Sequence, residues 1–363
     1  MSNTLNLPSA KAPLNVLAGR KARALIGDGG LHMANVKVLA GASGGPKWLV
    51  LSQIDRVLCR LLADRQAPLY GIGSSIGSWR LAAHAMPDPL QGIDALEYAY
   101  IHQRYDTRPS AAEVSAVARG MMSAFLQPEG QPHLLNHPWL KLAFIAVRSR
   151  GPGASPLRLL QLLHLLSAAA INTASRRALT VFFERVLFTS AGFEPTLIGP
   201  DVFRTTHCEL TPSNLSQALL ASGSIPLVLE GVRDIPGSRL GAYYDGGITD
   251  YHLNLNYQLA DDEVVLMPHF YPHITPGWFD KALKYRKPNT AWLDNVVIVA
   301  PSPQFVQSLP GGYIPDRKDF ERFFQRDDAR IAQWYEVISR SEALAVEFER
   351  LLSGESMPVG ALT

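Results

Sequence analysis

Residues 69–77 read LYGIGSSIG, a short apolar run that ends in a turn of serine and glycine. Residues 75–86, which follow it, are spaced as a helix. A unit of the same kind lies upstream, where the apolar run 36–42 (VKVLAGA) stops at Ser43 and residues 48–62 again show helical spacing. Two successive strand–helix units predict an α/β fold with parallel strands.

Five further apolar runs are predicted as strands, and they lack the polar alternation of a half-exposed sheet. Strands of this kind are typically covered by helices on both faces. We therefore predict a layered α/β fold with a largely parallel central sheet flanked by helices. These five strand segments are residues 141–147, 179–188, 202–208, 263–267 and 295–300.

The C-terminal part of the chain has a different composition. Residues 316–350 contain 16 charged side chains, and apolar residues such as Phe320, Trp334 and Phe348 recur near helical spacing. We predict that residues 316–363 form an amphipathic helical segment of the same domain. The main α/β domain is expected at 36–315, and residues 1–35 are expected to form an N-terminal extension that packs on it.

Charge and cysteine content exclude several classes of protein. The 363 residues include 34 Lys and Arg against 32 Asp and Glu, a net charge of +2, and only 18% are charged. This balance excludes an acidic disordered chain and gives no indication of nucleic-acid binding. Cys59 and Cys208 are too few for a disulfide framework and fit no zinc motif. We expect no metal and no cofactor.

Two segments bear on whether the protein is secreted or spans a membrane. Residues 1–15 contain a single Lys and no apolar run of signal-peptide length. The most apolar stretch, residues 157–171 (LRLLQLLHLLSAAAI), is shorter than the roughly 20 residues of a spanning helix. We expect a cytoplasmic protein and leave peripheral contact with a membrane open. The sequence makes no prediction of oligomeric state.

Two serine loops are candidate nucleophile sites. Ser75 lies in a G-x-S-x-G pattern, where Gly73 and Gly77 permit a sharp strand-to-helix turn that projects the serine hydroxyl. The start of the following helix also favours negative charge at the serine. Residues 41–45 (GASGG) match the same pattern, so Ser43 is a rival nucleophile, and an ordinary turn is the alternative for either loop.

The first serine loop also resembles a phosphate-binding loop. That pattern requires glycine at the position of Pro46 and serine or threonine at the position of Trp48, and proline has no N–H to offer a phosphate. We therefore reject nucleotide binding here. Gly44 and Gly45 instead provide adjacent backbone N–H groups of the kind that stabilise an oxyanion, with Lys47 nearby.

A serine nucleophile needs a base, and the residues leave several candidates. His84 is excluded because it lies more than two turns further along the helix that follows Ser75. His252, His269 and His273 stay open on position alone. Asp245, within residues 244–247 (YDGG), is more distinctive, although Asp-Gly is also a favoured hairpin turn.

Taken together, these segments resemble the patatin-like phospholipase family. The resemblance covers about residues 36–250 and consists of four motifs in the family's order. They are the Gly-Gly-x-basic loop (Gly44 to Lys47), the serine elbow (Ser75), the stretch 221–226 (ASGSIP) and the Asp-Gly-Gly at Asp245.

The resemblance implies a serine acyl hydrolase with a Ser–Asp dyad. Ser75 would attack an ester carbonyl, Asp245 would accept its proton, and the N–H groups of Gly44 and Gly45 would hold the oxyanion. The implied substrates are lipids or other apolar esters, and Ser43 would belong to the oxyanion loop. The loop departs from the family pattern, since Lys47 replaces arginine and Trp48 replaces glycine.

Two alternatives stay open beside this hypothesis. The first is an esterase of the α/β-hydrolase type, with a Ser75, acid and histidine triad. The second is a non-catalytic relative that binds lipid or protein, and the altered loop at Lys47 and Trp48 motivates it.

Three peripheral features complete the predictions. For the apolar helix at 157–171 we favour packing into the core with a narrow exposed strip, and an acyl-binding wall or lid that touches lipid is the alternative. Arg176 and Arg177 are interpreted as complements of the helix dipole. Trp278 is expected at a pocket mouth or in loop packing.

Overall fold

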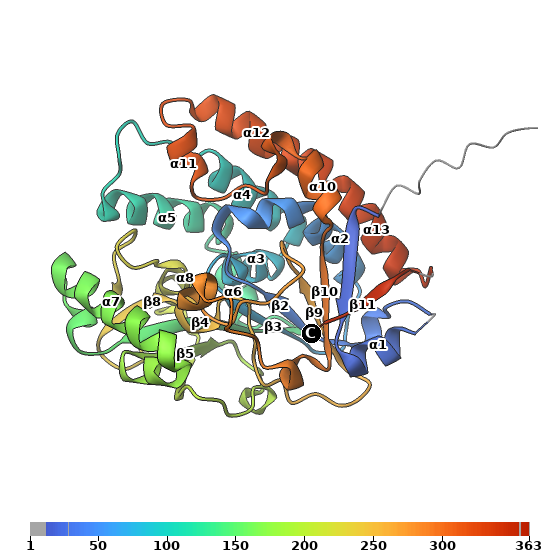
Figure 1. Ribbon diagram of the computed structural model, residues 1–363, viewed down its shortest axis with the longest axis horizontal. Coiled ribbons are helices and arrows are strands. Elements are labelled where there is room, and N and C mark those ends of the chain that lie inside the picture. Colours follow the sequence, from blue (N-terminus) through green and yellow to red (C-terminus); the bar gives the residue numbers. More distant parts are fainter. Residues whose placement is uncertain (1–11, 28, 356, 363) are drawn as a thin grey trace, which may run out of the picture.

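One 11-stranded sheet forms the centre of the computed structural model, which describes residues 12–27, 29–355 and 357–362 (Figure 1). Its strands are β1 Leu14–Ala18, β2 Val36–Gly41, β3 Leu69–Ser74, β4 Leu140–Ser149, β5 Phe183–Thr189, β6 Thr205–Glu209, β7 Val232–Arg233, β8 Ala242–Asp245, β9 Val264–Pro268, β10 Val296–Pro301 and β11 Val359–Ala361. They lie in the order β11-β1-β10-β9-β2-β3-β4-β5-β6, and β8 pairs with both β4 and β7. Neighbours from β10 to β4 are parallel, whereas β5 and β8 run antiparallel to β4. The predicted α/β fold with a largely parallel sheet is confirmed.

Helices cover one face of this sheet in a thick layer (Figure 1). The α-helices are α1 Arg20–Ile26, α2 Ser52–Leu62, α3 Ile76–His84, α4 Pro89–Ile101, α5 Ala111–Phe125, α6 Gly130–Leu135, α7 Arg158–Ala174, α8 Leu215–Gly223, α9 Gly247–Asp250, α10 Pro303–Ser308, α11 Asp319–Arg322, α12 Asp327–Arg340 and α13 Glu342–Leu352. The largest core cluster joins residues of β2, β3, β4 and β9 to the apolar sides of α2, α3, α4, α8, α12 and α13. The predicted C-terminal helical segment is therefore present as α11, α12 and α13. Its end differs from the prediction, since Val359–Ala361 forms the strand β11 and pairs with β1.

The opposite face of the sheet is covered differently from our expectation of helices on both sides. There, Val38, Ile72 and Ile145 pack against loop residues such as Phe193 and Leu253. Only at one end does a helix take part, since the inner side of α7 packs beside β4 and β5. Much of the second core layer is therefore made of loop rather than helix.

The N-terminal segment contributes a strand. Leu14–Ala18 pairs antiparallel with β10 and parallel with β11, so this part of the predicted extension lies within the sheet. Residues 1–11 of the extension lie outside the described residues, as do residues 356 and 363 of the C-terminal segment.

Two predicted boundaries are wrong. The segment 179–188 starts as a 3₁₀ turn, η4 (Arg176–Val181), and becomes a strand only at Phe183. Helix α8 begins at Leu215, after a turn that the Asn214 side chain closes by accepting from the Thr211 N–H at 2.8 Å. The predicted helix at 48–62 likewise opens as 3₁₀, in η2 (Gly45–Leu51).

The orientation of α7 also contradicts our prediction. Its leucines Leu159, Leu162, Leu163 and Leu166 are 40–66% exposed instead of packed in the core. The inward side of the helix is mixed, since Leu165 and Ala168 are buried there with the polar His164 and Asn172. His164 lies 3.3 Å from the Ser149 hydroxyl and packs between phenylalanines. The helix therefore presents a largely apolar surface to its surroundings, with Arg158 and Ser167 also exposed.

A buried polar cluster joins α2 to α3. Arg80 donates to both Asp55 carboxylate oxygens at 2.7 and 2.9 Å, and His84 lies 3.3 Å from both Asp55 and Cys59. Burial on its own would raise the pKa of Asp55, but the charges and hydrogen bonds of Arg80 and His84 lower it to about 2. His84 is therefore part of a structural network, as its exclusion as a base predicts.

Candidate active site

The register of β4 brings Ser75 and Asp245 together. β3 pairs with the first part of β4, where Ser74 lies opposite Ile145. β8 takes the place of β3 along the rest of β4, so that Asp245 lies opposite the next residue, Ala146. Two segments that are 170 residues apart therefore end side by side on one strand.

Ser75 forms a strained turn between β3 and α3. Its backbone angles are φ 57° and ψ −131°, a conformation that residues with a side chain rarely adopt. Gly77 permits this turn, because a Cβ there would lie 1.8 Å from the carbonyl oxygen of Gly41 in β2. The predicted elbow is thus present, and it leaves the hydroxyl at the start of α3.

Asp245 accepts a hydrogen bond from Ser75. The two side-chain oxygens, Oγ and Oδ2, are 2.6 Å apart, and the other carboxylate oxygen accepts from the Gly247 N–H at 2.7 Å. Burial raises the pKa of Asp245 to about 6, although both hydrogen bonds and the charges of Arg317 and Lys281 oppose this rise. A carboxylate that is ionised at neutral pH and more basic than usual is suited to accept a proton from the serine.

One short segment, residues 222–224, holds both members of this pair. Ser222 Oγ accepts from the Ser75 N–H at 3.0 Å and donates to the carbonyl of Ile145 at 2.7 Å. The Asp245 N–H donates to the carbonyl of Ser224 at 2.9 Å. The sequence singled out this stretch only by resemblance, and the positioning role of Ser222 was missed.

The loop after β2 lies beside the dyad. Gly44 and Gly45 both line the cavity that contains Ser75, and Gly45 has φ 56°, which favours glycine. They stand at the N-terminal end of η2, where amide N–H groups have no partner within the helix. Lys47 lines the same cavity. Ser43, the rival nucleophile, donates instead to the Ser74 hydroxyl at 2.9 Å.

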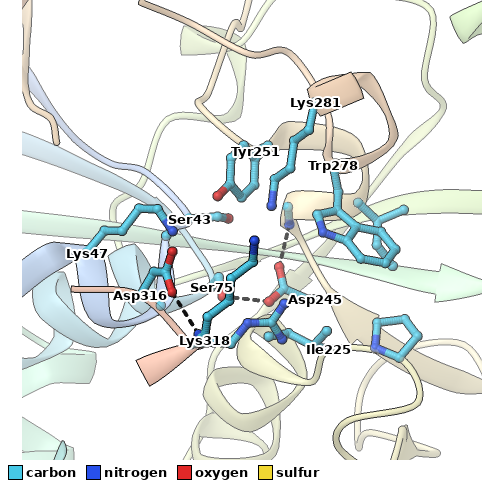
Figure 2. Close-up of a pocket in the computed structure, with 16 residues that line it drawn as sticks. Ser43, Lys47, Ser75, Ile225, Asp245, Tyr251, Trp278, Lys281, Asp316 and Lys318 are labelled. Carbon is cyan, nitrogen blue, oxygen red and sulfur yellow. Dashed lines mark hydrogen bonds between the residues drawn. The ribbon is translucent and has the colours of Figure 1, made fainter. Parts of the chain in front are cut away.

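The cavity around Ser75 has a volume of about 210 Å³ and a lining of both apolar and charged residues. Its apolar lining consists of Ile225, Pro226, Ile248 and Trp278. Of the two positions predicted for Trp278, the pocket and loop packing, the structure shows the pocket. The remaining residues are mostly polar or charged, and Figure 2 shows Lys47, Tyr251, Lys281, Asp316 and Lys318 around the serine and aspartate. No sequence motif marked Tyr251, Lys281, Asp316, Arg317 or Lys318.

The candidate histidines lie elsewhere. Among the described residues that line this cavity there is no histidine. His252 and His269 are buried in contact with each other, and burial lowers the pKa of both, that of His269 to about 3. Burial also lowers the pKa of His273. The structure therefore brings an aspartate, and not a histidine, to Ser75.

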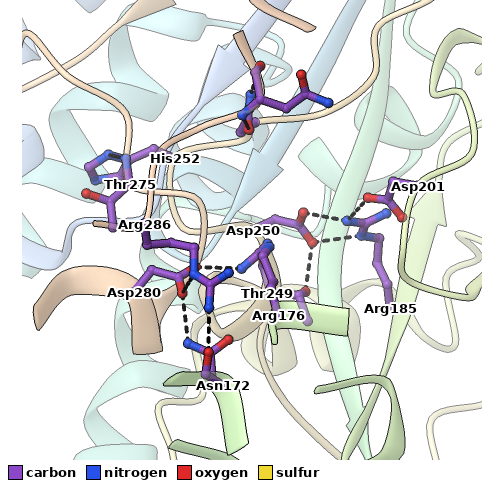
Figure 3. A network of polar contacts seen from close by, with 12 residues as sticks. Asn172, Arg176, Arg185, Asp201, Thr249, Asp250, His252, Thr275, Asp280 and Arg286 are labelled. Atoms are coloured by element: carbon purple, nitrogen blue, oxygen red, sulfur yellow. Dashed lines mark hydrogen bonds and ion pairs between the residues drawn. The ribbon is translucent and has the colours of Figure 1, made fainter. Parts of the chain in front are cut away.

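A polar network supports the wall of the cavity behind α9 and the 3₁₀ turn η6 (Trp278–Ala282), as Figure 3 shows. Asp280 of η6 accepts from Arg176 and from Asn172, each at 2.8 Å. Arg185 donates to both carboxylate oxygens of Asp250 in α9, at 2.6 and 2.7 Å. Arg176 is thus an internal anchor, which corrects our interpretation of it as a complement of the helix dipole.

Comparisons with known proteins add no family assignment. A scan against protein-family models and a search of curated proteins both found no match. In the part of the chain that the structure describes, no cluster of His, Cys, Asp and Glu side chains has a metal-binding arrangement. Within the same residues, no helix combines the length and apolar character needed to cross a bilayer.

Proposed function

We propose that the protein is a serine acyl hydrolase of the patatin-like type, which cleaves the carboxylic ester bonds of lipids or other apolar esters. The observation that carries the proposal is the 2.6 Å hydrogen bond from Ser75 to Asp245. Three further features support it: the strained serine turn, the raised pKa of Asp245, and the glycine pair at the same cavity.

The reaction would begin when Ser75 Oγ attacks the ester carbonyl and Asp245 takes the hydroxyl proton. The N–H groups of Gly44 and Gly45 would stabilise the negative charge on the carbonyl oxygen. Asp245 then returns the proton to the departing alcohol, which leaves an acyl group on Ser75. A water molecule, deprotonated by the same carboxylate, attacks the acyl-enzyme, and the bond between the acyl carbon and Ser75 Oγ breaks. Asp245 returns the proton to Ser75 Oγ, and the carboxylic acid is released.

The exposed apolar face of α7 supports lipid as the substrate class. The inner residues of this helix, Leu165 and Ala168, pack in one cluster with Tyr244 and Ile248, close to the dyad. Its outer leucines would enter the apolar layer of a lipid surface. This arrangement supports peripheral contact between the protein and a lipid aggregate next to the active site.

The charge around α7 favours a lipid surface with anionic head groups. Residues 130–183 contain no Asp or Glu, and the exposed Arg158 and Arg177 flank the helix. Basic side chains near a membrane add to the binding of an apolar face when the lipids are anionic. A second copy of the same face would instead bring like charges together.

The proposal is tested with a panel of 4-nitrophenyl esters from acetate to palmitate. Wild-type protein should hydrolyse them, whereas Ser75→Ala and Asp245→Asn should each lose at least a hundredfold in kcat, because each removes a group that acts on the reacting atoms. Ser43→Ala is the matched serine control and should retain most of the activity.

Two results would contradict the proposal in different ways. If Asp245→Asn were fully active and a His252, His269 or His273 variant were inactive, a histidine-based esterase would replace the dyad. If no ester were cleaved while the protein still bound vesicles, it would be a non-catalytic lipid-binding relative.

A further inference from the structure

Four basic side chains line the same cavity as Ser75. They are Lys47 in η2, Lys281 in η6, and Arg317 and Lys318 in the turn before α11. Three separate parts of the chain therefore deliver positive charge to one site, and Figure 2 shows Lys281 and Lys318 beside the serine and aspartate. The only carboxylates among the described lining residues are Asp245 and Asp316.

These four cations have no ion-pair partner within 4 Å among the described residues. Asp316 accepts instead from the Lys318 backbone N–H at 2.7 Å and lies 3.8 Å from Arg322, outside the cavity lining. Asp245 is occupied by Ser75 and Gly247. The site therefore carries an excess of positive charge that the protein itself does not neutralise.

Burial and the repulsion of neighbouring cations both lower the pKa of Lys281 and of Lys47. Burial in the cavity, together with the charges of Lys47 and Arg317, lowers the pKa of Lys281 to about 7, against the opposing charge of Asp245. Burial also lowers the pKa of Lys47, and Arg317 and Lys318 add to this effect while Asp316 opposes it. An anion bound among them would relieve this repulsion.

The basic groups are held by rigid parts of the structure. Lys281 follows Asp280, which the network of Figure 3 fixes to α7, and its ammonium nitrogen lies 3.8 Å from the centre of the Tyr251 ring. Lys318 precedes Asp319, a buried carboxylate that accepts from the Trp334 indole N–H at 2.9 Å. The turn that carries Arg317 and Lys318 is thus anchored to α12.

The cavity is accessible from solvent and has an apolar part. Lys281, Arg317 and Lys318 remain exposed along their side chains, so a ligand can reach them from solvent. Ile225 and Trp278 add an apolar surface to the same cavity, and the Lys281 ammonium nitrogen lies 5.9 Å from the centre of a Trp278 ring. A molecule that matches this lining has an apolar part and a negatively charged group a short distance apart.

We propose that this cavity binds an ester that carries a phosphate or carboxylate group near the scissile bond, with Lys281, Arg317 and Lys318 as the anion-binding residues. The proposal rests on the proposed function, because it names the substrate class of the same site. A charge-assisted hydrogen bond from one such side chain contributes about tenfold or more to affinity when it is partly shielded from water. A neutral ester would leave the excess positive charge uncompensated.

The test measures binding by calorimetry in the Ser75→Ala background, where the ester is not consumed. Dihexanoyl phosphatidate, below its micelle concentration, should bind at least tenfold more tightly than dihexanoylglycerol. Adding Lys281→Gln or Lys318→Gln should weaken phosphatidate binding about tenfold. Lys284→Gln is the matched control, because this exposed lysine lies just beyond η6 and does not line the cavity, and binding should stay within twofold.

Turnover by the protein with Ser75 intact shows on which side of the scissile ester bond the anionic group of the substrate lies. A preference for mono-4-nitrophenyl glutarate over 4-nitrophenyl valerate, reduced in Lys318→Gln, would place it on the acyl side, and a preference confined to phosphatidate would place it on the alcohol side. Either result supports the proposal.

Three results would overturn it. Equal binding of phosphatidate and dihexanoylglycerol is the first, and an equal loss in Lys284→Gln, which would indicate only diffuse electrostatics, is the second. The third is inorganic phosphate binding as tightly as phosphatidate with the same lysine dependence, since the site would then recognise a free anion. If no ester were cleaved but the lysine-dependent preference persisted, the hydrolase function would fail while the anion site stood.

Discussion

Replacement of Asp245 by asparagine should make the protein more stable while it abolishes turnover. The carboxyl group of Asp245 is 6% exposed, and burial raises its pKa from 3.8 to about 6. A difference of about 2 pKa units corresponds to roughly 3 kcal/mol, at about 1.4 kcal/mol per unit. The ionised carboxylate therefore destabilises the folded state by about that amount at neutral pH, and Asp245→Asn removes this cost.

The destabilisation by the ionised Asp245 carboxylate depends on pH, because the pKa of Asp245 differs between the folded and unfolded states. Because the folded-state pKa is higher than the unfolded-state value, the unfolded chain binds fewer protons between pH 3.8 and 6, and the cost of the buried charge grows over that interval. It is constant above pH 6 and nearly absent below pH 3.8. Asp245→Asn should raise the free energy of unfolding by up to about 3 kcal/mol at pH 8 but by less than about 1 kcal/mol at pH 4.

Urea unfolding followed by tryptophan fluorescence at pH 8 and pH 4 measures both values. Asp64→Asn is the control, because Asp64 is exposed and the change should stay within about 0.5 kcal/mol at either pH. A loss of stability in Asp245→Asn at pH 8, or an equal gain at both pH values, would refute the reasoning.

Three further predictions follow from the same structure. The value of kcat/KM should fall below about pH 6 as Asp245 is protonated, and a profile that stays flat down to pH 5 would contradict its role as base. The double change Leu162→Ser and Leu163→Ser should reduce co-sedimentation of the protein with anionic vesicles severalfold. Leu61→Ser, at an exposed leucine of α2, is the control and should leave co-sedimentation unchanged. Equal effects of the two changes would refute α7 as the lipid contact. Asp55→Asn should lower the free energy of unfolding at pH 7 by about 2–3 kcal/mol, because the partners of Asp55 hold its folded-state pKa below the unfolded-state value. This contribution is present above about pH 4 and is lost as the pH falls towards 2. Thermal unfolding of the wild type and the variant from pH 7 to pH 3 measures it, and a stability difference that does not change with pH would contradict the prediction.

The strands of the central sheet could be predicted because their sequences are continuous apolar runs. β2, β3, β9 and β10 appear within one or two residues of the predicted bounds, since buried parallel strands tolerate few polar residues. The elbow at Ser75 was also predictable, because the glycines on either side serve a local turn whose geometry depends on neighbouring residues.

The partnership of Ser75 with Asp245 was not predictable from local sequence. It depends on β8 continuing the line of β3 along β4, a register that no periodicity reveals. The sequence marked Asp245 as a distinctive Asp-Gly-Gly, and only the family resemblance paired it with Ser75. The basic residues Lys281, Arg317 and Lys318 carried no motif at all, because each lies in a loop and acquires its place from tertiary packing.

The direction of α7 was predicted wrongly for a related reason. Helical spacing tells which side chains share a face, but it does not tell which face meets the protein. Here the inward face carries partners for polar groups: Ser149 lies beside His164, and Asp280 accepts from Asn172. These contacts allow His164 and Asn172 to be buried beside Leu165 and Ala168, and most of the other leucines of the helix are exposed.

Covalent labelling with a fluorophosphonate probe tests the central claim most directly, because the probe reacts only with an activated serine. Peptide mass spectrometry of the labelled protein should place the adduct on Ser75, and labelling should be lost in Ser75→Ala and strongly slowed in Asp245→Asn. Heat-denatured protein, in which the hydrogen bond between the two side chains is broken, should not react. An adduct on Ser43 that persists in Ser75→Ala would contradict the assignment of the nucleophile.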